Sequence, residues 1–221
     1  MTTIAIDIQP QCRFSCFAAN DQQCVHQPEN IVPELNRQAR FAQKRVLVEN
    51  TSTAKETLCA SLCGGQEHAA RNLFTFSLEN HFPNAASCRG THLLKGLPCP
   101  ADYDHAVETE GDKAASACFH DSKESRSTGL IEWLYAQNAQ TIILGGLATE
   151  HAVLETAQHL AWYNDNWHII VNLAACRGYT PEATLKAVFS LRQAGITVVT
   201  DTDEIPAAIA AGAPLLMSKA S

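Results

Sequence analysis

Short apolar runs, separated by stretches with helical spacing, constrain the fold of this chain more than any other feature. The runs cover residues 3–8, 45–50, 72–78, 105–109, 141–146, 168–173 and 196–200. Several are continuous and rich in β-branched residues, which is typical of strands buried on both faces. We therefore expect a sheet that is largely parallel.

Helical signals occupy the stretches between these runs, at 29–43, 127–137 and 180–195. In the last of them Thr180 is a suitable N-cap, and Pro181 stands at the first helical position, where its missing N–H costs nothing. Strands that alternate with helices in this way predict a three-layer, doubly wound α/β fold.

The composition suits one globular domain over residues 1–221. Of these residues 46% are hydrophobic and 18% are charged, which is enough for one large core and little for two. The pattern weakens between 51 and 104, where we expect irregular cover over one end of the sheet. The apolar tail from 204 to 221 is expected either to dock, for instance at a subunit contact, or to be a loosely ordered terminus.

The charge pattern excludes some classes of partner. The net charge is −7 without a basic block, so we expect no binding to nucleic acid or to an anionic membrane surface. No run approaches the roughly 18 apolar residues that span a bilayer. A cytoplasmic protein with a small-molecule or protein partner, and with a possible homo-oligomeric state, fits best.

Nine cysteines are an odd number in a chain too large to need disulfide bonds. Cys12 and Cys16, and likewise Cys59 and Cys63, are four residues apart. This spacing favours thiols packed on a helical face over a zinc site, whose ligands usually lie in tight knuckles.

Polar residues follow three of the predicted strands. Asp7 lies at the end of the first, Glu108 and Glu110 follow "HAV", and "GGLATEHA" (145–152) follows "TIIL". Ligands of open α/β sheets bind beyond the carboxyl ends of the strands. The fold would bring these separate segments to one edge.

These segments resemble the isochorismatase-like hydrolases, and most closely the nicotinamidases. "IAIDIQ" is similar to the first strand of that family, with its catalytic aspartate at Asp7 followed by Gln9. "GLATEHAV" is similar to the turn that carries the nucleophile, and it is the most specific part of the resemblance. The resemblance also implies a non-proline cis peptide before Ala148.

The family's enzymes use an aspartate base, a lysine and a nucleophilic cysteine. The cysteine position here is Ala152, which has no lone pair for attack, so a thioester route through it is excluded. The lysine position is Glu110, and a register slip of three would offer Lys113 instead. If Glu110 faced Asp7, the two carboxylates could share a proton and act on water without a covalent step.

The resemblance also implies a divalent metal in nicotinamidases, but the ligand positions are changed. Asn50 and Ser52 stand where an aspartate and a histidine would be, and Ala86 or Ser87 replaces a further histidine, leaving His81 nearby. Amide and hydroxyl groups are poor ligands for a zinc-like ion. We predict no metal and no other cofactor.

The remaining pocket is expected to be lined by residues from several strand ends: Gln9, Phe14, Cys118, Phe119, Leu147, Ala148, Thr149, His151 and Ala152. Cys118 and Cys176 are expected to be buried, inert thiols, because neither follows a helix N-terminus or stands beside an obvious base.

Two functions follow from this sequence. The first is a catalytically degenerate member of the family that binds a small molecule or a partner through the old pocket. The second is an active hydrolase that uses Asp7, Glu110 and water on an unknown small substrate. Ala152 argues against an ordinary nicotinamidase.

Overall fold

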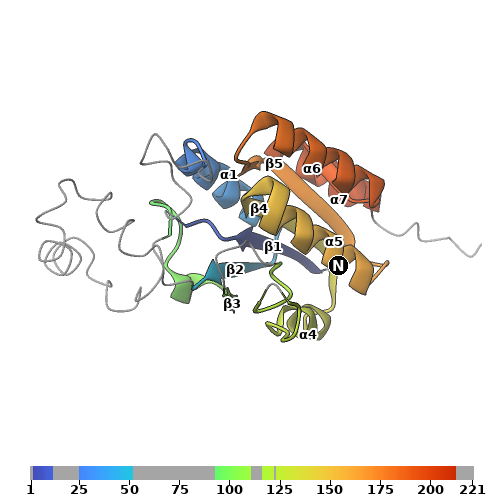
Figure 1. Ribbon diagram of the computed structural model, residues 1–221. Helices are drawn as coiled ribbons and strands as arrows, with labels where there is room; N and C mark the ends of the chain where they lie inside the picture. Colours follow the sequence, from blue (N-terminus) through green and yellow to red (C-terminus); the bar gives the residue numbers. More distant parts are fainter. Residues whose placement is uncertain (1, 12–24, 52–92, 111–115, 122, 213–221) are drawn as a thin grey trace, which may run out of the picture.

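A six-stranded parallel sheet forms the centre of the computed structural model, which describes residues 2–11, 25–51, 93–110, 116–121 and 123–212 (Figure 1). The strand order is β3-β2-β1-β4-β5-β6, and every pairing is parallel. The strands are β1 (Thr2–Ile8), β2 (Lys44–Asn50), β3 (His105–Thr109), β4 (Ala139–Leu147), β5 (His168–Arg177) and β6 (Thr197–Val199).

Helices cover both faces of the sheet (Figure 1). One face packs against α4 (Leu130–Ala136), α5 (Leu154–Tyr163) and α6 (Pro181–Gln193). The other packs against α1 (Val32–Gln38), which lies between the 3-10 turns η2 (Pro28–Ile31) and η3 (Ala39–Phe41), and against α7 (Ile205–Gly212). Two further 3-10 turns are η6 (Pro100–Asp102) and η8 (Thr202–Glu204). The predicted three-layer, doubly wound α/β fold is confirmed.

Local signals fixed several of these elements. The run at 105–109 is β3, and the Thr180 hydroxyl accepts a hydrogen bond from the Ala183 amide (3.1 Å), as expected of the N-cap of α6. The helix predicted at 127–137 begins only at Leu130, because its N-cap Gly129 has a left-handed φ of 83°. The strand predicted at 72–78 lies outside the described residues.

The sheet changes winding direction between β1 and β4, which are neighbours although they are far apart in the chain. Residue 146 must be a glycine there, since its φ is 141° and the Cβ atom of any other residue would lie 2.0 Å from the Ile8 carbonyl oxygen. Such a reversal is where ligands bind in open α/β sheets. Gly146 thus lets β4 approach β1 closely beside the expected ligand edge.

None of the helices in the described ranges has the length and apolar content to cross a membrane.

Candidate functional site at the strand ends

The Asp7 carboxylate is fully buried and surrounded by donors. Arg45 Nε donates to Oδ2 at 2.8 Å, the Tyr103 hydroxyl donates to the same oxygen at 2.9 Å, and Gln38 Nε2 lies 3.4 Å from Oδ1. Arg45 Nη2 is also 2.6 Å from Oδ2, an ion-pair contact that is not aligned as a hydrogen bond. Both carboxylate oxygens are therefore already occupied by side chains of this chain.

The environment of Asp7 sets its ionisation. Burial raises the pKa of the Asp7 carboxyl, and the Arg45 charge and the Tyr103 hydroxyl oppose that shift. The same burial, together with the negative charge of Asp7, raises the pKa of the Tyr103 hydroxyl, which therefore stays a donor. Arg45 also stacks over the Tyr103 ring, with its guanidinium carbon 5.0 Å from the ring centre.

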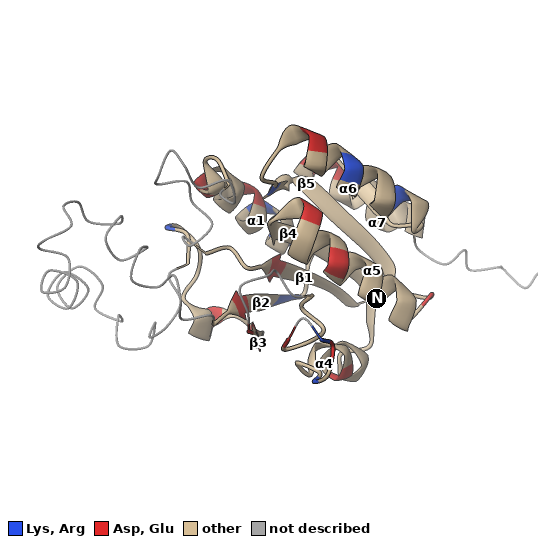
Figure 2. Ribbon diagram, viewed as in Figure 1, with Lys and Arg blue, Asp and Glu red and all other residues tan. Residues whose placement is uncertain are grey.

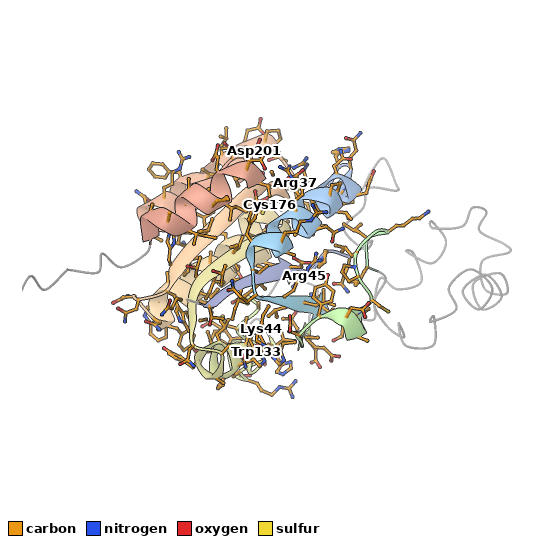
Figure 3. All side chains as sticks on the ribbon, turned by 180° about the vertical axis from the view of Figure 1, so that it is seen from behind. Arg37, Lys44, Arg45, Trp133, Cys176 and Asp201 are labelled. Atoms are coloured by element: carbon orange, nitrogen blue, oxygen red, sulfur yellow. The ribbon has the colours of Figure 1, made fainter. Side chains whose placement is uncertain are left out.

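Asp7 points toward the α1 face of the sheet. Successive strand residues face opposite sides, and its neighbours Ile6 and Ile8 belong to the apolar cluster beneath α4, α5 and α6. Gln38, which bonds Asp7, comes from α1. Figure 3 looks onto this side and shows Arg45 between α1 and β2.

Ala152 lies on the opposite face. It is fully buried in the same apolar cluster as Ile8, within a π-helical turn, η7 (Thr149–Val153), that leads into α5. The peptide bond between Leu147 and Ala148 is cis, as the resemblance predicted. Ala152 therefore packs with the α4–α6 side of the sheet, whereas the side chains that bond Asp7 lie on the α1 side.

Glu110 lies apart from both. In the register of the sheet, Asp7 is level with Leu47 and hence with Ala106. Glu110 is four residues beyond Ala106, which places it about 13 Å further along the strand direction and about 10 Å across the sheet. Its side chain is 64% exposed, and its charged partner is Arg126 at 3.8 Å. Lys113, the other candidate for this position, lies outside the described residues.

Both candidate replacement cysteines are buried thiols. Burial raises the pKa of the Cys118 thiol to about 12, and it raises the pKa of the Cys176 thiol to about 12 as well. A thiol with such a pKa carries almost no nucleophilic thiolate at neutral pH.

Two buried polar atoms at the β1–β4 reversal have no hydrogen-bond partner among the described residues. They are Gln9 Oε1 and Thr149 Oγ1, and both residues are fully buried. The Gln9 amide nitrogen bonds Thr109 Oγ1 (3.2 Å), and the φ of Gln9 is 46°. Since buried polar atoms are normally paired, these two atoms are candidates for contact with a ligand.

Among the positions where the resemblance implies metal ligands, Asn50 is the one that lies within the described residues. Asn50 is buried, and its backbone exchanges hydrogen bonds with the Gln11 side chain. Across the described ranges, histidine, cysteine and carboxylate side chains form no group of three that could hold a metal ion. Ser52, His81, Ala86 and Ser87 lie outside those ranges.

The other expected lining residues spread over the edge of the sheet. His151 is exposed, and its ring centre is 5.4 Å from that of Tyr179. Phe119 is partly buried against the α4–α5 side and contacts the His159 ring. Leu147 and Ala148 are fully buried in the cluster beneath α1. Phe14 lies outside the described residues.

Arg45, Tyr103 and Gln38 were absent from the sequence-based site. One signal could have found Arg45: it is a charged residue directly before the apolar run 46–48 of β2, and a buried charge requires an opposite one. Tyr103 and Gln38 give no comparable signal, because each reaches Asp7 from an element distant in sequence.

The likeness to solved structures covers almost the whole chain. A protein of L. infantum in complex with nicotinate matches at 17% identity and a TM-score of 0.61, over 90% of this chain and 92% of that chain. A nicotinamidase and pyrazinamidase of Acinetobacter baumanii matches at 16% and 0.62, over 92% and 98% of the two chains. An isochorismatase-like hydrolase of Alkaliphilus metalliredigens matches at 16% and 0.60, over 95% and 100%.

At such identities these likenesses establish the fold alone. None of the curated proteins matches the sequence. The family profile described as "Isochorismatase domain", however, matches residues 2–204, which is most of the chain. This chain therefore belongs to the isochorismatase family.

Proposed function

We propose that this chain is a catalytically degenerate member of its family, which binds a small carboxamide-bearing ring at the strand ends without hydrolysing it. The observation that carries the proposal is the ion pair between Asp7 and Arg45. A general base must reach the proton that it removes, and this carboxylate is buried and occupied on the α1 face.

The other candidate groups support the same function. Ala152 offers no nucleophile, and the thiols of Cys118 and Cys176 are protonated at neutral pH. Glu110 is exposed and far from Asp7 in the register of the sheet. The non-covalent hydrolase with an Asp7–Glu110 pair thus has no supporting contact among the described residues.

The ligand class follows from two kinds of support. Gln9 Oε1 can accept a hydrogen bond from an amide N–H, and Thr149 Oγ1 can donate to a carbonyl or ring nitrogen. Relatives of this fold include a nicotinamidase and a protein crystallised with nicotinate. Nicotinamide presents the matching amide, carbonyl and ring nitrogen, so it is the first ligand to test.

Binding is tested by titration calorimetry with nicotinamide. We expect binding without product, and roughly fivefold weaker binding for Thr149→Val, since one hydrogen bond contributes about 1 kcal/mol. Thr141→Val is the matched control. Thr141 is also a buried threonine, but it lies near the start of β4, whereas Thr149 follows the end of that strand. Equal affinity in Thr149→Val, or no binding at millimolar nicotinamide, would contradict the proposed site.

Loss of catalysis is tested by ammonia release from nicotinamide. We expect none from the natural chain and none from the Ala152→Cys/Glu110→Lys double variant, because Asp7 remains paired with Arg45. Turnover by the natural chain that Glu110→Gln abolishes would overturn the degenerate function, and Glu110 is exposed enough for that change to leave the fold intact.

A further inference from the structure

The outward side of α6 is unusual for a surface helix because its centre is apolar. Ala187 and Leu191 are buried against the sheet side, whereas Leu185 is 69% exposed and Phe189 is 63% exposed. The exposed positions of the helix after Pro181 are Glu182, Leu185, Lys186, Phe189, Arg192 and Gln193. We call this set the α6 face.

The α6 face is arranged symmetrically about the middle of the helix. Leu185 and Phe189 are each two residues from Ala187, and Glu182 and Arg192 are each five residues from it. If two such helices pack antiparallel around a twofold axis level with Ala187, Leu185 of one meets Phe189 of the other. In the same register each Glu182 meets the Arg192 of the other helix, so that a pair of opposite charges lies at each end of the apolar centre.

The helix dipole is a second physical reason for an acidic residue at the start of α6 and a basic residue at its end. An acidic first turn and a basic last turn suit the helix dipole, and α6 has Glu182 in its first turn and Arg192 in its last; Figure 2 colours the acidic and basic residues along this helix. The dipole gives no reason, however, for two large apolar side chains at exposed positions. Pairing with a second α6 explains the charges and the apolar centre together.

The neighbouring helix extends the apolar surface. α5 packs beside α6 on the same face of the sheet (Figure 1), and its Trp162 is 78% exposed. Large aromatic side chains bury roughly 150–250 Å² each. Phe189 and Trp162 from two copies would therefore supply several hundred of the roughly 1,200–2,000 Å² that stable interfaces bury.

We propose that the α6 face is the interface of a homodimer, in which two α6 helices pack antiparallel about a twofold axis near Ala187. A twofold interface uses the same patch on both copies, and only a self-complementary patch satisfies it. From Glu182 to Arg192 the helix is about 15 Å long, so both end contacts form when the helices cross at the shallow angle of about 20°. This inference does not depend on the proposed ligand.

Charge reversal tests the register directly, by sedimentation velocity over a concentration series of the full chain. Glu182→Arg puts two arginines at each end contact, and Arg192→Glu puts two glutamates there. We expect each single variant to dissociate at least tenfold more readily than the natural chain. We expect the double variant, and an equimolar mixture of the two single variants, to recover association, because each restores opposite charges at both ends.

Two further variants keep the test decisive. Phe189→Glu places a charge at the apolar centre and is expected to abolish association, with circular dichroism confirming that the fold is kept. Lys186→Glu is the matched control, because Lys186 is on the same face but meets no charged residue in this register. A natural chain that is monomeric throughout, dimers that persist in Phe189→Glu, or single reversals that the double variant does not rescue would each overturn the proposal.

Discussion

The Arg45 guanidinium on β2 donates to the buried Asp7 carboxylate on the neighbouring strand β1, at 2.8 Å. The family resemblance assigns Asp7 to catalysis together with a lysine, and that lysine position is Glu110 here. The cation that pairs with Asp7 in this chain comes instead from the start of β2. This replacement gives the aspartate a structural partner, and its consequences can be measured.

Removing Arg45 should be strongly destabilising at neutral pH. Arg45→Met leaves a buried carboxylate without its cation, and such losses cost about 3–5 kcal/mol. Urea unfolding at pH 7 measures the loss. Asp7→Asn combined with Arg45→Met should recover part of it, since no unpaired charge is then buried.

The same variant should respond to acid in a defined direction. Without Arg45 the pKa of Asp7 rises further above its unfolded value, so the folded state holds its proton more tightly than the unfolded state does. The difference in the free energy of unfolding between Arg45→Met and the natural chain should therefore shrink as the pH falls from 7 toward 4.5. A deficit that is equal at both pH values would contradict the buried pair.

Gly146 should tolerate no side chain. A Cβ atom would lie 2.0 Å from the Ile8 carbonyl oxygen, at a φ of 141°, so Gly146→Ala must separate β4 from β1. We expect the free energy of unfolding to fall by more than the roughly 1–3 kcal/mol of ordinary overpacking, so that the variant is insoluble or unfolded. Gly129→Ala is the matched control, because Gly129 also has a positive φ but nothing lies within 4 Å of the added atom. Its loss should be about 1 kcal/mol.

The sequence was sufficient for the parts of this fold that depend on local chemistry. The β-branched run at 141–146 predicted a buried strand, and Thr180 with Pro181 predicted the start of α6. The cis bond that the structure has before Ala148 was implied by the family resemblance of "GLATEHAV" and not by its local chemistry.

The surroundings of Asp7 could not be predicted in the same way. Its neighbours come from α1, from β2 and from the residue after η6, and only the packed fold decides which of them reaches a strand residue. The side of the sheet to which Asp7 points was also open, because a strand in a three-layer fold is apolar on both faces. Family position alone therefore suggested a convergence with Glu110 that the register of β3 does not provide.

Cys118 and Cys176 should resist alkylation in the native protein. Burial raises the pKa of each thiol to about 12, so at pH 8 on the order of one thiol in ten thousand is ionised, at tenfold per pH unit. Iodoacetamide labelling followed by peptide mass spectrometry should modify both only in denaturant. Rapid native labelling of either cysteine, while the circular dichroism spectrum is unchanged, would show a reactive thiol that the proposed function excludes.

His168 should make the fold sensitive to mild acid. Its Nε2 lies 3.0 Å from Thr197 Oγ1, its Nδ1 is buried without a hydrogen-bond partner among the described residues, and burial lowers the pKa of its imidazole. The unfolded chain then binds a proton near pH 6.5 that the folded chain binds only at lower pH. Stability is full above about pH 6.5 and declines as the pH falls below it.

The Tm measured by calorimetry between pH 7.5 and 5.5 tests this. We expect His168→Gln to lose less Tm over this range than the natural chain. A part of the pH dependence should remain, because burial also lowers the pKa of His105, which stacks on Trp133 at 4.8 Å. If the two profiles run parallel, the imidazole of His168 is not the group that resists protonation, and the His105 ring becomes the one to replace next.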